Sequence, residues 1–253
     1  MIQKIIGNQD TLVSALIFAS IFFAGPRWRV NLEIHKGYRR VVSFSAGIAI
    51  AYVFINFLPE LSEASELFLE HTRDLSVPFP QHWVYGASLL GFVLFYGIGY
   101  IATARLSSAA SQETPHDPKE MVRFVTTITA YSLYAGLICY LLVHSLEGGY
   151  MNEALYTVAM VLHFVSLRYS LWNEYEDMFS RWGKNILGVS CLVGWLIAVF
   201  LPMPVTVIIT LLGFISGGVI MTTMIAELPR EKQGRFLYFF LGAALYAGLL
   251  VSI

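Results

Sequence analysis

The feature that most constrains this chain is a series of long apolar segments separated by short polar loops. We place eight of them, at residues 10–26, 41–60, 83–104, 123–145, 153–173, 185–202, 204–228 and 236–253. A bilayer core about 30 Å thick is crossed by about 20 apolar residues in an α-helix, which is close to the length of each segment. Because a backbone in lipid must satisfy its own hydrogen bonds, such segments are expected to be helical. The sequence therefore predicts an all-α membrane protein with about eight transmembrane helices.

The composition excludes an ordinary soluble domain. Hydrophobic residues make up 57% of the chain and charged residues only 13%, whereas a soluble domain has about a quarter of its residues charged. A net charge of −1 offers no basic surface, so we expect no nucleic-acid partner. Cys139 and Cys191 lie inside apolar runs, and we interpret them as small buried hydrophobic residues and not as a disulfide or zinc pair.

The basic residues fall on alternate loops, which predicts the orientation in the membrane. If the N-terminus lies outside, the inner loops hold 13 of the 16 lysines and arginines, as expected for cytoplasmic loops. Most of the positive charge near the first segment follows it, so we interpret that segment as an anchor and not as a cleaved signal peptide. We therefore expect both termini on the non-cytoplasmic side of the plasma (inner) membrane.

Two segments share a short pattern at a constant offset. Residues 44–47 read Phe-Ser-Ala-Gly and residues 214–217 read Phe-Ile-Ser-Gly, and each is followed by Leu-Pro, at 58–59 and at 228–229. The small residues predict close helix contacts, and each proline is predicted to end its helix.

The two segments run in opposite directions, which predicts an inverted repeat within one polytopic transmembrane domain, residues 1–253. Helices 1–3 would match helices 6–8, with helices 4 and 5 as a central pair. The alternative is chance agreement, because Gly and Pro are common in membrane helices.

These features resemble the ZIP (Zrt/Irt-like) metal-ion transporters. The stretch from Ser43 to Glu60, which ends in Leu-Pro-Glu, is similar to the second helix of that family, and Gly213 to Pro229 is similar to its seventh. The helix number, the outer termini and the 3+2+3 arrangement are similar too. The resemblance implies a secondary transporter or facilitator of divalent metal ions and not an enzyme.

At the positions of the family's metal ligands, on helices 4 and 5, the chain departs from the family pattern. Tyr131, Ser132 and Ala135 stand where helix 4 of the family carries ligands. In helix 5, His163 keeps the first histidine, and Arg168 stands where glycine is usual. One imidazole cannot hold a transition metal alone, since such sites need several donors at about 2.0–2.3 Å. A route for metal ions would therefore need an altered site, with His163 as its ligand. The hydroxyl groups of Tyr131 and Ser132 suit a neutral or anionic ligand better than a metal ion.

Polar residues at membrane depth are costly, about 2.5–3.5 kcal/mol each on insertion scales, and each has a structural alternative to a functional role. His163 is either a ligand, proton carrier or gate, or a neutral histidine bonded to a neighbouring helix. Arg168 either extends to the membrane surface or pairs with Glu227 across the bundle. Asn56, near the outer end of helix 2, is either part of the transport site or a hydrogen bond between helices.

Carboxylates and histidines also gather outside the membrane. Glu63, Glu66 and Glu70 recur at helical spacing, which predicts an amphipathic surface helix that could attract cations to an entrance. His144 and Glu147, three residues apart at the outer end of helix 4, could share a metal ion or be ordinary boundary residues.

Three functions remain open on this sequence. The first is a divergent ZIP-like transporter or facilitator, with a divalent metal ion as one candidate cargo. The second is a ZIP-like scaffold or sensor subunit that moves no metal, and the third is an intramembrane enzyme acting on a lipid or quinone. No nucleotide-binding motif is present, so ATP is not expected as an energy source. Membrane lipids are the expected partners and a homodimer is one oligomeric option. The sequence leaves open whether the chain binds a cofactor.

Overall fold

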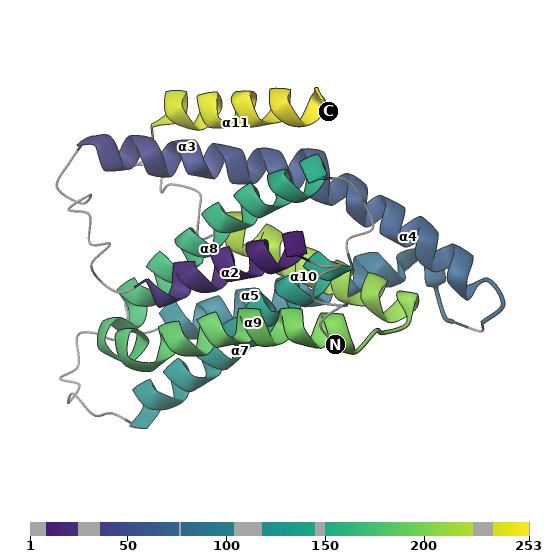
Figure 1. Ribbon diagram of the computed structural model, residues 1–253, viewed down its shortest axis with the longest axis horizontal. Coiled ribbons are helices and arrows are strands. Elements are labelled where there is room, and N and C mark those ends of the chain that lie inside the picture. The colour runs from purple at the N-terminus through teal and green to yellow at the C-terminus, as the bar shows by residue number, and fades with distance from the viewer. Residues whose placement is uncertain are drawn as a thin grey trace.

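The computed structural model describes residues 9–24, 36–75, 77–103, 118–144, 150–224 and 235–252. Within these ranges all regular structure is helical. Each of the eight predicted apolar segments lies in a helix over most of its described length (Figure 1). The longer helices are α2 Gln9–Phe23, α3 Lys36–Tyr52, α4 Leu58–Thr72, α5 Trp83–Thr103, α7 Pro118–Val143, α8 Tyr150–Met178, α9 Lys184–Phe200, α10 Val205–Thr222 and α11 Phe236–Val251.

The helices have the length and apolar character of membrane spans. Five helical runs in the described ranges are long and apolar enough to cross a bilayer: Ser43–Thr72, Pro80–Ile101, Glu120–Val143, Ala154–Phe200 and Val205–Thr222. The helices α2 and α11 are shorter but also apolar. Large apolar side chains such as Leu89 and Leu133 are exposed on the outside of the bundle, where lipid can cover them. The chain is an integral membrane protein.

The run Ala154–Phe200 is helical over 47 residues but consists of two helices, α8 and α9, that run in different directions. Tyr175 has non-helical backbone angles, φ −130° and ψ 35°, and a π-helical turn, η5, follows at Phe179–Gly183. Figure 1 shows α8 running to the left-hand side of the molecule and α9 returning to the right. The direction therefore reverses within a helical link, where the sequence predicts a loop.

Pro59 does not end its helix, so that prediction is wrong. A π-helical turn, η3 at Val53–Phe57, comes just before α4, in which Pro59 lies in the first turn. In a regular α-helix, proline lacks the N–H that would bond to the carbonyl four residues earlier, and its ring clashes with that carbonyl. The π turn before Pro59 has a wider hydrogen-bond spacing, so this clash is avoided. The helix therefore continues through Thr72, well beyond the predicted end at residue 60. Pro229, the counterpart in the second segment, lies outside the described residues.

Glycines set the closest helix contacts, and two crossings share one arrangement. Where α3 crosses α11, a Cβ atom built on Gly47 would lie 2.1 Å from the carbonyl oxygen of Phe239. One built on Gly242 would lie 2.2 Å from that of Phe44. The predicted close approach at Gly47 is confirmed.

The crossing of α5 with α10 repeats this geometry. A Cβ atom on Gly217 would lie 1.8 Å from the carbonyl oxygen of Ser88, and one on Gly91 would lie 1.9 Å from that of Phe214. Phe44 and Gly47 precede Phe214 and Gly217 by 170 positions, and Ser88 and Gly91 precede Phe239 and Gly242 by 151. The two crossings therefore match residue by residue.

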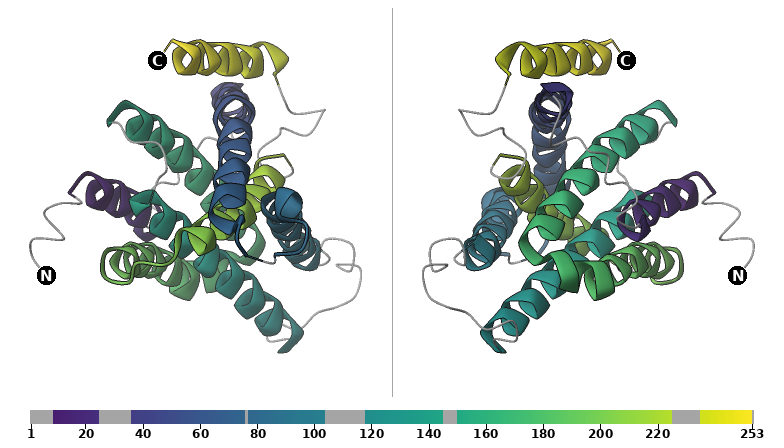
Figure 2. Two further views of the ribbon diagram at one scale, coloured as in Figure 1. Left: turned by 90° about the vertical axis from the view of Figure 1, so that its right-hand side faces the viewer. Right: turned by 90° about the vertical axis from the view of Figure 1, so that its left-hand side faces the viewer.

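The helices pack as two groups. The first comprises α3, α4, α5, α10 and α11, in which α5 packs on α10 and α3 on α11. The second comprises α2, α7, α8 and α9, in which α9 packs on both α7 and α2. The groups meet mainly where α7 contacts α5 and α10 and where α3 contacts α8. In both views of Figure 2, α11 lies at the edge of the bundle, next to α3, and in Figure 1 α2 begins and α11 ends toward the same side.

Candidate functional site

The centre of the bundle holds a hydrogen-bonded pair of polar side chains. The Tyr134 hydroxyl of α7 lies 2.9 Å from Nε2 of His163 on α8. The two side chains are 1% and 2% exposed, so both are removed from solvent and lipid. This contact is the bond to a neighbouring helix that the structural interpretation of His163 expects, and it offsets the cost of burying the imidazole.

The pair lies where the two helix groups meet. The ring of Phe95, on α5, has its centroid 4.7 Å from that of Tyr134 and 5.8 Å from that of Tyr131. Gly218, on α10, leaves the space for these rings, since a Cβ atom there would come within 2.7 Å of Phe95 and 3.0 Å of Tyr134. Any relative movement of the two groups would therefore change the surroundings of His163.

Of the two helix 4 residues predicted for the site, only one joins the pair. Tyr131 is buried and packs edge-on against Tyr134 with ring centroids 6.2 Å apart. The Ser132 hydroxyl instead donates to the carbonyl of Ile128, one turn earlier in its own helix, at 2.6 Å. The direct partner of His163 is thus Tyr134, which follows Tyr131 by one helical turn.

Polar contacts continue from this pair toward the end of α8. The hydroxyls of Thr127 and Tyr175 lie 3.1 Å apart and are buried. Tyr175 is also the kink residue of α8. Phenols and hydroxyls therefore follow the α7–α8 interface from Tyr134 to the turn at its end.

A second polar cluster surrounds Asn56. Asn56 lies in the π turn η3 and donates to the Tyr52 hydroxyl at 3.4 Å, a long hydrogen bond. The ring of Tyr52 lies 6.3 Å from that of Tyr156 on α8 and 6.4 Å from that of Tyr246 on α11. π turns often occur at functional sites, and this one joins α3 to α4 and contacts α11. The surrounding tyrosines come from three distant segments, so the sequence did not indicate them.

Arg168 binds the end of another helix. Its guanidinium donates to the carbonyl of Ala24, the residue that follows α2, and its side chain is half-buried. The last carbonyls of a helix lack partners within the helix and carry partial negative charge, so a cation is favourable there. Glu227, the predicted partner of Arg168, lies outside the described residues.

We expect replacement of Arg168 by alanine to destabilise the protein by about 1.5–3 kcal/mol, because a charged hydrogen bond to a helix end is lost. Arg168→Lys should retain part of the stability, since it keeps the positive charge. The free energy of unfolding by SDS titration measures both variants. Arg181 is an exposed arginine near the same end of α8, so Arg181→Ala is the control. Equal effects at the two arginines would contradict the capping role.

The metal hypothesis finds little geometry to support it. Within the described ranges no three His, Cys, Asp or Glu side chains gather at one point. His163, the ligand expected from the family resemblance, directs its Nε2 atom at Tyr134. At the outer end of α7, the buried Nε2 atom of His144 has no hydrogen-bond partner among the described residues, and its expected co-ligand Glu147 lies outside them.

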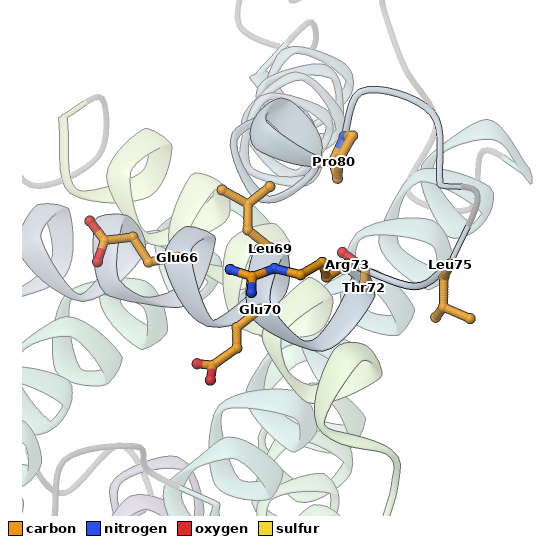
Figure 3. A pocket seen from close by; sticks show the side chains of 7 residues that line it. All are labelled: Glu66, Leu69, Glu70, Thr72, Arg73, Leu75 and Pro80. Carbon is orange, nitrogen blue, oxygen red and sulfur yellow. The ribbon is translucent and has the colours of Figure 1, made fainter.

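The predicted acidic helix is α4, and it borders a pocket. Glu63, Glu66 and Glu70 all lie in α4, as predicted. An open pocket of about 470 Å³ lies at the end of this helix, with Glu66, Glu70 and Arg73 in its lining, and Figure 3 shows these side chains.

Comparison with known proteins adds no relative: no family model matches the chain, and no curated protein matches its sequence. The residues and their geometry therefore carry the functional argument.

Proposed function

We propose that this chain is a secondary transporter or facilitator of ZIP-like architecture, with eight membrane crossings and an inverted repeat of helices 1–3 on helices 6–8. The observation that supports this best is the pair of matching glycine crossings. In that numbering α3 and α10 are helices 2 and 7, and α5 and α11 are helices 3 and 8. An inverted repeat relates helix 2 to helix 7 and helix 3 to helix 8. The crossing of helices 2 and 8 (α3 and α11) then corresponds to the crossing of helices 7 and 3 (α10 and α5). Inverted repeats of this kind are typical of secondary transporters.

The helix directions support the eight-crossing arrangement. The run Ala154–Phe200 folds back on itself between α8 and α9, so it supplies two crossings. The helices α2 and α11, with 15 and 16 residues, rise about 1.5 Å per residue and nearly cover the bilayer core. We expect both termini on the non-cytoplasmic side because, in the order of the sequence, the basic residues fall in the loops that join the opposite ends of the helices.

The proposed transport route runs between the two helix groups. Its inner part is the Tyr131–Tyr134–His163 region, and its outer part is the cluster of Tyr52, Asn56 and Tyr156. Each part has side chains from both groups in contact, so rocking of one group against the other would open the route first to one side and then to the other. Phenol, amide and imidazole groups favour a hydrogen-bonding cargo over a divalent metal ion.

Cysteine accessibility tests for alternating access without knowledge of the cargo. In a Cys139→Ala/Cys191→Ala background, Tyr131→Cys should react with a membrane-impermeant maleimide added to either side of reconstituted vesicles. Leu133→Cys, on the exposed outer face of the same helix, should stay unreactive because lipid disfavours the thiolate. Protection of the thiol of the Tyr131→Cys variant from both sides would reject transport and favour the scaffold or sensor function.

Uptake of zinc, manganese and iron into vesicles that contain a metal-sensitive dye tests the cargo. We expect no metal-dependent signal above that of protein-free vesicles, with His163→Ala the same as the unmodified chain. A signal that the unmodified chain gives and His163→Ala abolishes would show that the altered site carries metal.

A further inference from the structure

The carbonyl oxygen of Phe54, in the π turn η3, has no hydrogen-bond donor among the described residues. In an α-helix its donor would be the N–H of Leu58, but that N–H bonds to the carbonyl of Val53. In a π-helix the donor would be the N–H of residue 59, which is Pro59 and has none. No described side chain donates to Phe54 either. A bare carbonyl within a membrane-spanning run is costly, so a donor from outside the chain is expected.

This carbonyl lies at one end of an apolar groove on the outside of the bundle. The groove holds about 330 Å³, within the range of small-molecule sites. It runs between α11 and the α3–η3 segment, and Figure 2 shows α11 at the edge of the bundle. The lining is wholly apolar: Ile50, Ala51, Phe54, Ile55, Phe240, Ala243, Ala244 and Ala247. Because a helical carbonyl points along the axis toward the residues that follow it, the acceptor lies at the end of the groove nearer to α4.

Alanines create the groove at positions where the matching pair of helices carries larger side chains. At the offset of 151 that relates the two glycine crossings, Ala243 on α11 corresponds to Phe92 on α5. At the offset of 170, Ala51 on α3 corresponds to Met221 on α10. Met221 is buried, and Phe92 packs against the core. The groove is therefore a feature of one half of the molecule and not a necessary result of the crossing.

The depth of the acceptor disfavours a charged head group. Phe54 precedes Glu60, the predicted outer end of this segment, by six positions, which is about 9 Å along a helix. A phosphate, carboxylate or ammonium group at that depth would lose its hydration, and the two anions have no hydrogen to donate to a carbonyl. A neutral hydroxyl group can donate one hydrogen bond and costs far less to bury.

The groove is narrow at its other end. There α3 and α11 come into backbone contact, since a Cβ atom on Gly47 would lie 2.1 Å from the carbonyl oxygen of Phe239. A slot that closes between two helices is filled better by a single hydrocarbon chain than by a rigid, fused ring system.

We propose that this groove binds a diacylglycerol, whose free hydroxyl donates to the carbonyl of Phe54 while one acyl chain lies along the alanines. The hydroxyl then points toward the membrane surface and the chain toward the bilayer centre. Because diacylglycerol has no charged head group, it can lie deeper than a phospholipid and reach the acceptor. This binding does not depend on transport.

Native mass spectrometry of the purified full chain in detergent can test this proposal with two lipids that have the same chains. Dioleoylglycerol carries the free hydroxyl, and in 1,2-dioleoyl-3-acetylglycerol that hydroxyl is esterified and cannot donate. We expect dioleoylglycerol to bind about tenfold more tightly, as one hydrogen bond to an otherwise unsatisfied carbonyl would give.

The variant Pro59→Ala supplies the missing N–H, which can bond to Phe54 in a π register, while a return to the α register would let Leu58 do so. The tenfold preference should therefore disappear, and binding of the acetyl ester should stay unchanged. Leu58→Ala is the control, because Leu58 is exposed, does not line the groove and keeps its N–H on substitution. This variant should retain the preference.

The variant Ala244→Phe fills the groove and should weaken both lipids by a similar factor. Leu245→Phe, at an exposed neighbouring position outside the lining, should bind both lipids as the unmodified chain does. Since Ala244 is also exposed, both variants should melt at the temperature of the unmodified chain.

Equal binding of the two lipids to the unmodified chain, or an unchanged preference in Pro59→Ala, would overturn the hydroxyl contact. Cholesterol bound as tightly as dioleoylglycerol would overturn the assignment to an acyl chain. A dimer that persists in excess lipid and is lost in Ala244→Phe would overturn the lipid proposal in favour of a second copy of the chain.

Discussion

The substitution Gly217→Leu is expected to separate α10 from α5 and to leave little folded protein. A Cβ atom there would lie 1.8 Å from the carbonyl oxygen of Ser88 and 2.8 Å from the backbone nitrogen of Phe92. Both neighbours are backbone atoms of a helix, so neither can move aside without displacing α5. We expect a loss of more than about 3 kcal/mol, beyond the usual range for an overpacked core. Gly47→Leu should have an effect of similar size, because Gly47 meets the backbone of α11 in the same way.

The repeat supplies its own controls for this experiment. Gly97 on α5 and Gly248 on α11 are also 151 positions apart, and a Cβ atom at either meets nothing within 4 Å. Gly97→Leu and Gly248→Leu should therefore leave stability nearly unchanged. The amount of monodisperse protein that survives heating in detergent, measured by size-exclusion chromatography, compares the four variants. If Gly217→Leu survives as well as Gly97→Leu, the close crossing is not present in the protein.

The sequence was informative where structure follows from local composition. The apolar segments lie in helices because each is long enough to satisfy its backbone within lipid. The close contacts at Gly47 and Gly217 were predictable because small residues are what close helix packing requires. The partner crossings at Gly91 and Gly242 were not, since residues 88–91 read Ser-Leu-Leu-Gly and residues 239–242 read Phe-Phe-Leu-Gly. Two shared residues cannot be told from chance.

Features that depend on tertiary contacts could not be predicted. The π turn at Val53–Phe57 leaves no mark in hydrophobic periodicity, and so the rule that proline ends a helix failed at Pro59. The partner of Arg168 is a backbone carbonyl, at Ala24, which has no side-chain signature. For His163 the sequence indicated hydroxyls on helix 4, but only the rotation of α7 against α8 selects Tyr134 over Ser132.

Removal of the Tyr134 hydroxyl is expected to destabilise the protein because it leaves the buried Nε2 atom of His163 without this partner. The cost of one unsatisfied buried polar group is about 1–3 kcal/mol, and His163→Leu should cost a similar amount by leaving the Tyr134 hydroxyl without this contact. The double variant Tyr134→Phe/His163→Leu removes both polar partners together. It should therefore be more stable than the sum of the single effects predicts, by about 1 kcal/mol or more.

Unfolding free energies of the four proteins, measured by SDS titration, give this coupling directly. Ser132→Ala is the control on the same helix, because its hydroxyl bonds to its own backbone at Ile128 and such a bond adds little to helix stability. Additive single effects would mean that Tyr134 and His163 do not interact in the folded protein.

The coupling also bears on the proposed transport route, because a hydrogen bond at the contact between the two helix groups must persist, exchange or break when they move. Tyr134→Phe in the Tyr131→Cys accessibility background should therefore shift the ratio of labelling from the two sides, whereas Ser132→Ala should leave that ratio unchanged.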